Sequence, residues 1–145
     1  MIGLLQRVRS AWVEIDAERV AEIGVGLLVL VGVRPDDSMT NAERLLERVL
    51  NYRVFPDQQG RMNLSVKDSR GGLLLVPQFT LAADTKKGTR PSFTKAAAPD
   101  KGEDYFARLV DICRQSLSTV ETGQFGANMQ VVLTNDGPVT FWLET

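Results

Sequence analysis

The chain has 145 residues, the usual size of one domain, and we expect a single domain over residues 1–145. Its apolar fraction of 43% and its charged fraction of 24% are typical of a soluble globular protein. The net charge of −1 argues against a generic nucleic-acid coat, because such proteins are basic overall, but it leaves open RNA binding through a local basic patch.

Three further features predict a cytoplasmic protein. Cys113 is the only cysteine, so no internal disulfide can form, which fits a reducing cytosol. Residues 1–7 lack the basic leader and long apolar stretch of a signal peptide. The most apolar run, residues 25–33, is about half of the ~18 residues that a membrane span needs. We therefore expect no membrane contact.

The first third of the chain predicts strands, which we assign to residues 2–8, 11–15, 19–23 and 27–33. The last of these is nearly all apolar and suits a central strand that is covered on both faces. A turn with helix-capping residues follows at residues 34–38.

Two amphipathic helices are predicted next. The first ends near Tyr52, and its apolar positions at helical spacing are Ala42, Leu45, Leu46, Val49 and Leu50. Residues 55–60 predict a turn, and residues 73–76 predict a buried strand. The second helix follows Pro99 and Asp100, and its apolar side carries Tyr105, Phe106, Leu109, Val110, Ile112, Cys113 and Leu117.

Two terminal strands, residues 128–134 and 139–143, complete the expected fold. The Asn135-Asp136-Gly137 segment between them is a hairpin-type turn signal. The order of elements is strands, helix, strand, helix, strands. This order predicts an α+β fold in which helices pack on a largely antiparallel system of β-sheets.

Gly137-Pro138 is the sharpest single feature. Proline lowers the trans preference of the preceding peptide bond to ~0.5–1 kcal/mol, so a cis bond is accessible there. A cis bond after glycine would turn neighbouring carbonyls the same way and form a rigid acceptor surface without side chains. The alternative is an ordinary trans-proline turn, which the residues alone favour.

Gln78, Phe79 and Thr80 end the strand at residues 73–76 with an amide, an aromatic ring and a hydroxyl. Backbone N–H groups at a strand end can stabilise an oxyanion, and a threonine hydroxyl can donate a proton or attack. The chain contains no histidine, so the usual base for activating Thr80 is missing. The alternative is an ordinary strand whose threonine pairs across the sheet.

A basic loop follows, with Lys86, Lys87 and Arg90 near the aromatic Phe93. Such a loop could contact phosphates and stack on a base. The alternative is a solvated loop without a partner.

The remaining candidates predict no further chemistry. Cys113 lies on an apolar helical stripe and is expected to be a core thiol. Met129 alternates with buried strand positions, which is typical of a core residue. Asp16, Glu18, Asp36 and Asp37 have no metal-ligand spacing and no histidine beside them, so we expect no metal site.

Taken together, these segments resemble the D-aminoacyl-tRNA deacylase family, also called the D-tyrosyl-tRNA deacylase family. The resemblance runs along the whole chain, and the ordered segments that carry it are Gln6-Arg7-Val8, Gly26-Leu27-Leu28-Val29-Leu30, Arg61-Met62-Asn63, Gln78-Phe79-Thr80-Leu81, Lys87-Gly88-Thr89-Arg90-Pro91-Ser92-Phe93 and Asn135-Asp136-Gly137-Pro138-Val139-Thr140. It implies a three-layer β/β/α homodimer with two helices on one face and no cofactor.

The resemblance implies a hydrolase. Its substrate would be the ester that joins a D-amino acid to the 3′-terminal adenosine of tRNA, and glycine mischarged on tRNA would also be removed. We expect tRNA as the partner, bound in part by Lys86, Lys87 and Arg90, and we expect no DNA partner.

The resemblance also assigns the selection of chirality. Gly137 and Pro138 would form a cis pair that enters the other subunit's pocket, where fixed carbonyls occupy the space that an L side chain needs. Arg7 resembles the family arginine that holds this loop across the dimer, and Met129 resembles the one that lines the pocket.

For the chemistry, the resemblance places Gln78, Phe79 and Thr80 around the ester. We expect the N–H groups of Phe79 and Thr80 to bind the developing oxyanion. We also expect Thr80 to position the substrate while the ribose 2′-hydroxyl helps to activate water. One departure is Pro77, where the family usually has serine, because proline lacks both a backbone donor and a hydroxyl.

Two other functions stay open. A non-catalytic module of the same fold that binds the aminoacyl-tRNA 3′ end is favoured by Pro77 and by the lack of an obvious base. An unrelated amidase or esterase would use Thr80 as its nucleophile.

Overall fold

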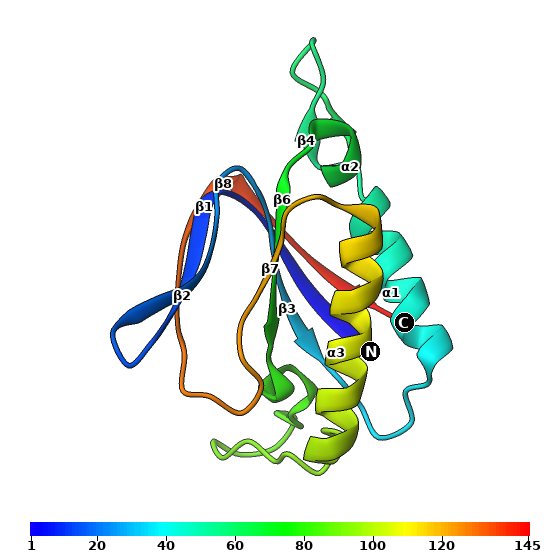
Figure 1. The fold of residues 1–145 in the computed structure, drawn as a ribbon. Coiled ribbons are helices and arrows are strands. Elements are labelled where there is room, and N and C mark those ends of the chain that lie inside the picture. The colour runs from blue at the N-terminus through cyan, green and yellow to red at the C-terminus, as the bar shows by residue number, and fades with distance from the viewer.

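The computed structural model describes residues 1–145, and a six-stranded mixed sheet lies at its centre (Figure 1). The strands of this sheet are β1 (Ile2–Ile15), β2 (Glu18–Ile23), β3 (Gly26–Gly32), β6 (Gly72–Pro77), β7 (Val120–Thr122) and β8 (Gln130–Glu144). Two long helices, α1 (Met39–Asn51) and α3 (Pro99–Ser116), lie side by side. The short elements are β4 (Phe55–Pro56), β5 (Met62–Leu64), α2 (Val66–Ser69) and the 3₁₀ turn η1 (Phe79–Ala82).

Strand β1 organises the sheet because it pairs with three neighbours. Its first half pairs antiparallel with β3, and its second half pairs antiparallel with β2. Strand β8 runs antiparallel to nearly all of β1, from Ile2 opposite Glu144 to Glu14 opposite Gln130. Strands β6 and β7 extend the sheet beyond β3 in parallel register. Antiparallel pairs therefore predominate, and the predicted α+β class is confirmed.

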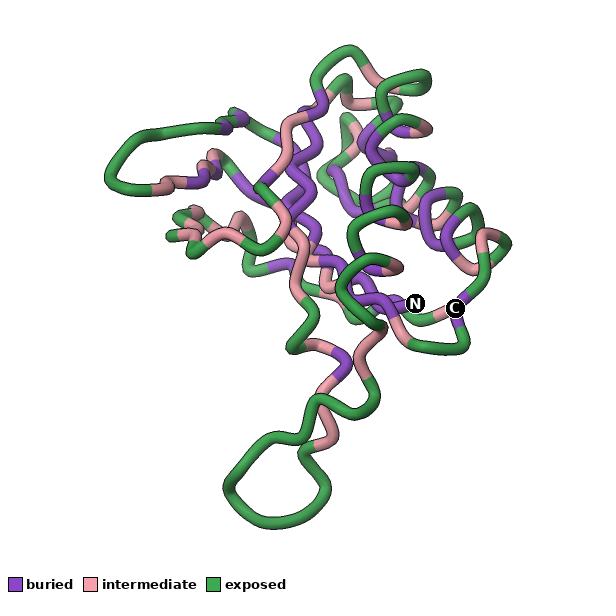
Figure 2. The backbone as a smooth tube through the Cα atoms, turned by 60° about the horizontal axis from the view of Figure 1, so that its bottom comes forward, coloured by how far each residue is buried: buried purple, intermediate pink, exposed green.

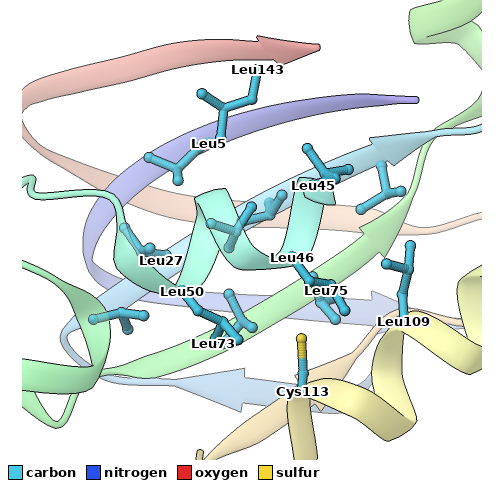
Figure 3. Close-up of a cluster of buried hydrophobic side chains, with 14 of the residues drawn as sticks. Leu5, Leu27, Leu45, Leu46, Leu50, Leu73, Leu75, Leu109, Cys113 and Leu143 are labelled. Atoms are coloured by element: carbon cyan, nitrogen blue, oxygen red, sulfur yellow. The ribbon is translucent and has the colours of Figure 1, made fainter. Parts of the chain in front are cut away.

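Two apolar clusters cover the two faces of the central strands. The larger lies between the sheet and both helices, and it includes Leu5, Leu27, Leu45, Leu73 and Leu109 (Figure 3). The smaller lies on the other face, where β2, the second half of β1 and the start of β8 curl over β3 and β6; it includes Val8, Ala11, Val13, Ile23, Leu28 and Leu74. Buried residues accordingly gather between these layers, while the loops are exposed (Figure 2). The arrangement is the expected three-layer β/β/α one.

Cys113 of α3 belongs to the larger cluster and is fully buried. Burial raises the pKa of the Cys113 thiol to about 12, because the thiolate would lose its hydration. The thiol is therefore neutral at ordinary pH, and the interpretation of Cys113 as a core residue is confirmed. No helix of the structure combines the length and the apolar character needed to span a bilayer.

Two predicted strand boundaries are wrong. Strand β1 is continuous, because the expected break near Arg9 is a pair of register shifts against β8. Strand β8 is also continuous, and both of its halves pair with β1, so the expected hairpin at Asn135-Asp136-Gly137 does not form. Gly137 has a φ of 127°, and the Gly137-Pro138 peptide is cis. Asn135, Asp136 and Gly137 therefore form a local bulge in β8 and do not reverse the chain.

Five short elements, namely β4, β5, α2, η1 and β7, were not predicted. The expected turn at residues 55–60 begins as strand β4, which pairs with β5. The single-turn helix α2 is capped by Ser65, whose hydroxyl oxygen accepts the Asp68 N–H. Strand β7 has one ladder, to β6. Each element is too short to give a periodic sequence pattern.

Strands β3 and β6 approach so closely at Gly26 that only glycine fits there. Gly26 of β3 lies opposite Gly72 of β6, and a Cβ atom at Gly26 would be 2.0 Å from the Gly72 carbonyl oxygen. We expect Gly26→Ala to lower the free energy of unfolding by at least about 2 kcal/mol, because the two strands must separate. Urea denaturation measures this change.

Gly24 provides the matched control, because a Cβ atom there would have no heavy atom within 4 Å. We expect Gly24→Ala to change stability by less than about 0.5 kcal/mol. Equal effects of the two substitutions would contradict the close approach of β3 and β6.

Candidate active site

The segment after β6 forms a tight turn that exposes main-chain donors. Pro77 is the last residue of β6, where a missing backbone N–H is tolerated. The Gln78 N–H donates to the Val31 carbonyl at 2.7 Å, which anchors the turn to β3. The 3₁₀ turn η1 then begins at Phe79, so the N–H groups of Phe79 and Thr80 have no carbonyl acceptor within the turn itself.

Thr80 does not sit in a strand, which removes the alternative of a threonine that pairs across the sheet. Its hydroxyl oxygen accepts a hydrogen bond from the Gln78 side-chain amide. The hydrogen-bond partner of the Thr80 hydroxyl is therefore an amide donor and not a base that could remove its proton.

A cavity of about 470 Å³ opens beside this turn. Pro77, Gln78 and Phe79 line one side of it. The segment from Phe125 to Met129 lines the other side, and the Met129 sulfur accepts the Gln124 N–H at 3.3 Å. The volume lies within the range of about 300–1,000 Å³ that is usual for small-ligand sites. The structure thus brings three of the expected site residues together, namely Gln78, Phe79 and Met129.

Thr80 lines a second hollow next to the turn. This hollow has a volume of about 1030 Å³, and its polar lining includes Arg34, Asp84, Lys86 and Lys95. The turn therefore borders both hollows: Phe79 lines the cavity, and Thr80 lines the second hollow.

The basic loop, residues 84–95, is closed at its base by Asp84 and projects below the sheet in Figure 1. The main chains of Asp84 and Ser92 exchange hydrogen bonds of 2.7 and 3.1 Å. The Lys95 ammonium, 2.8 Å from the Asp84 carboxylate, and the Lys86 N–H hold the pKa of Asp84 below its usual value. Asp84 therefore stays ionised and holds both ends of the loop.

The exposed part of this loop carries cations that pair with no acid. Lys86, Lys87 and Arg90 are exposed and belong to none of the ion pairs of the structure. The Phe93 ring packs edge-on against Phe79, with centroids 5.1 Å apart. The loop is thus joined to the turn beside the cavity and presents positive charge to solvent.

Gly137 and Pro138 are exposed and do not line either hollow of their own chain. The Arg7 side chain lies beside them: its Nε is 3.1 Å from an Asp136 carboxylate oxygen, and its guanidinium donates to the Val54 carbonyl. Arg7 therefore contacts the loop of its own chain, and its expected role across a dimer stays a prediction.

Some residues of the site were not found from the sequence. Phe125 lines the cavity, but it follows the unpredicted strand β7 and lies in an irregular segment without periodicity. Asp84 gave no signal either, because its role depends on contacts with Ser92 and Lys95 across the loop. No group of three or more His, Cys, Asp or Glu side chains in the structure could hold a metal ion.

Comparison with known proteins decides the family. The sequence model described as D-Tyr-tRNA(Tyr) deacylase matches residues 4–144. The chain belongs to this family. It is 63% identical over 144 residues to a D-aminoacyl-tRNA deacylase of Alkalilimnicola ehrlichii, with 99% of this chain and 96% of that protein covered. It is 57% identical to the protein of the same name from Pasteurella multocida, with 99% of both chains covered.

A solved structure agrees over the full length. The c-Myc DNA Unwinding Element Binding Protein superposes with a TM-score of 0.96 at 36% identity, covering 100% of this chain and 99% of that one. The resemblance seen in the sequence is therefore confirmed, and the chain is an enzyme of the deacylase family. Our expectation of no DNA partner stays a prediction.

Proposed function

We propose that the enzyme hydrolyses the ester that joins a D-amino acid to the 3′-terminal adenosine of tRNA. The observation that carries this proposal is the full-length identity of 63% to a D-aminoacyl-tRNA deacylase. The cavity beside Phe79 supports it, because its volume of about 470 Å³ suits an aminoacyl group with part of a nucleoside. A substrate of this kind also implies a cytoplasmic location.

In the proposed reaction, a water oxygen bonds to the ester carbonyl carbon, and the bond to the ribose 3′-oxygen then breaks as that oxygen takes a proton. The N–H groups of Phe79 and Thr80 stabilise the intermediate oxyanion. Loss of one such donor typically costs about 10²–10³ in rate. An aminoacyl ester is already activated, so orientation and these contacts suffice without histidine.

Thr80 acts in this proposal as a positioning group and not as the nucleophile. Its hydroxyl accepts a hydrogen bond from the Gln78 amide, so Thr80 fixes the Gln78 side chain, which lines the cavity. The ribose 2′-hydroxyl, which is adjacent to the ester, helps to activate the water. Pro77 supplies neither the hydroxyl nor the N–H of serine, so water in the cavity is held by other groups.

A second copy of the chain supplies the chirality check in our proposal. Gly137 and Pro138 are exposed and lie outside the cavity of their own chain, as a loop that enters a partner's cavity must. There the main-chain carbonyls occupy the position that an L side chain requires, while a D side chain points away. Glycine lacks that side chain, so the enzyme also removes glycine from tRNA.

A suitable surface for dimer formation exists on the sheet. Leu30, Leu4 and Trp142 are direct neighbours across β3, β1 and β8. They point away from the helices, because the adjacent Leu5 is part of the cluster under the helices. Trp142 is 50% exposed, and an exposed tryptophan in an apolar row is typical of an interface.

We propose that the basic loop binds the acceptor end of tRNA. The three unpaired cations Lys86, Lys87 and Arg90 suit phosphate groups. The Phe93–Phe79 contact places this loop next to the turn that carries the proposed oxyanion donors.

The primary test uses purified enzyme with D-tyrosyl-, L-tyrosyl- and glycyl-tRNA. We expect release of D-tyrosine and glycine, and D-tyrosine should be released at least about a hundredfold faster than L-tyrosine, which corresponds to about 2.7 kcal/mol. Equal release of both enantiomers would contradict the chirality check. Tight binding of a 3′-aminoacyl-adenosine analogue without turnover would identify a binding module instead.

The loop is tested by salt dependence. The variant Lys86→Ala, Lys87→Ala, Arg90→Ala should bind tRNA more weakly, and the slope of log affinity against log salt should fall by about two, because three phosphate contacts are lost. Filter binding at salt concentrations of about 50–200 mM measures this slope.

The control removes the same charge from the helices. The exposed Arg44, Lys67 and Arg108 lie on α1, α2 and α3. Their triple alanine variant should keep the wild-type slope. Equal slopes for the two triple variants would show that the basic loop is not the phosphate contact.

A further inference from the structure

Residues 136–139 leave the ladder between β1 and β8 and form a local excursion. Val8 pairs with Asn135, and Gln6 pairs with Thr140, so only Arg7 lies opposite the excursion. Because of the excursion, main-chain carbonyls of β1 and β8 at this point have no regular hydrogen-bond partner on the opposite strand. Some other group must satisfy these carbonyls, because partly buried carbonyls are rarely left without a donor.

The Asn135 side chain fills this need. Its amide nitrogen donates to the Arg7 carbonyl at 3.1 Å and to the Val139 carbonyl at 3.0 Å. The two donors of one amide group thus join β1 to the far end of the excursion. A carboxylate of the same shape has no donor and would face two carbonyl oxygens.

A second contact holds the near end. The Asp136 carboxylate lies 3.1 Å from the Arg7 Nε and 3.2 Å from the Arg9 Nε. The Arg7 side chain is only 12% exposed, and it also donates to the Val54 carbonyl, so it is itself fixed. Both ends of the excursion are therefore held while Gly137 and Pro138 at its tip stay exposed.

We propose that Asn135 is a positioning residue that sets the enantioselectivity of the enzyme. The inference rests on the proposed function, in which the tip of the excursion excludes L side chains. Exclusion by main-chain atoms works only if those atoms do not yield, and Asn135 makes the two hydrogen bonds that prevent this. Asn135 lines neither hollow, so it acts on the rejection of L-substrates and not on the ester chemistry.

The decisive variant is Asn135→Asp. We expect kcat/KM for L-tyrosyl-tRNA to rise about tenfold or more, because two hydrogen bonds are lost. The value for D-tyrosyl-tRNA should stay within about threefold, since the excursion has no contact with the reacting ester. Hydrogen exchange of the Asp136, Gly137, Val139 and Thr140 amides, measured without substrate, should quicken by about tenfold.

Asn51→Asp is the matched control. The Asn51 amide donates to the Glu47 carbonyl at 2.7 Å, at the end of α1. This variant removes the same kind of hydrogen bond elsewhere and should leave selectivity and exchange at residues 136–140 unchanged.

The outcomes separate the two proposals. Unchanged rejection of L-tyrosyl-tRNA by Asn135→Asp, or an equal loss of activity on both enantiomers, overturns the role of Asn135 while the proposed function stands. Absence of D-tyrosine release by the wild type overturns the proposed function, and the exchange measurement then still tests the bracing of the loop.

A milder variant covers the case in which Asn135→Asp does not fold. Asp136→Asn keeps the size of the side chain and removes its charge attraction to both arginines. It should also relax the rejection of L-tyrosyl-tRNA, by about threefold or more. Full rejection by a folded Asp136→Asn protein would overturn the proposal that fixed ends of the excursion set selectivity.

Discussion

The antiparallel pairing of β1 with β8 is the interaction on which the rest of the structure depends. It runs from Ile2 opposite Glu144 to Glu14 opposite Gln130 and joins the two ends of the chain. Because both strands are long and their register shifts near Arg7, they leave the layer under the helices and curl over β3 and β6. The β1–β8 ladder therefore contributes side chains to both apolar clusters. It also places the start of β8 beside the cavity, which Val131 lines.

The same ladder explains why the proposed selective element is main chain. Residues 136–139 leave a strand that is held on both sides, so the excursion has fixed ends and little freedom. A side chain in that position would have rotamers through which it could yield to an L-substrate. Carbonyl groups on a short, braced segment have no such freedom. The proposed discrimination by exclusion suits this construction, and so does the proposed acceptance of glycine.

The sequence predicted what is local and missed what depends on distant pairing. Helices α1 and α3 were predicted because their apolar stripes repeat at helical spacing. The hairpin at Asn135-Asp136-Gly137 was wrong because the partner of both flanking segments is β1, more than a hundred residues away. Gln78 and Thr80 were predicted to share one site, and their side chains are hydrogen-bonded. The 3₁₀ turn that lets them line two different hollows had no sequence signal. Phe125 had no local signal at all.

The central claim is that each selective site combines the cavity of one copy with the Gly137-Pro138 loop of another. A mixed dimer tests this most directly, with Gln78→Ala in one copy and Gly137→Val in the other. If the site forms across the interface, one of the two sites of the mixed dimer combines an intact cavity with an intact loop. About half of the wild-type D-specific activity should then remain, with full rejection of L-tyrosyl-tRNA. If cavity and loop act within one chain, every site carries a defect, and no wild-type-like selectivity is recovered.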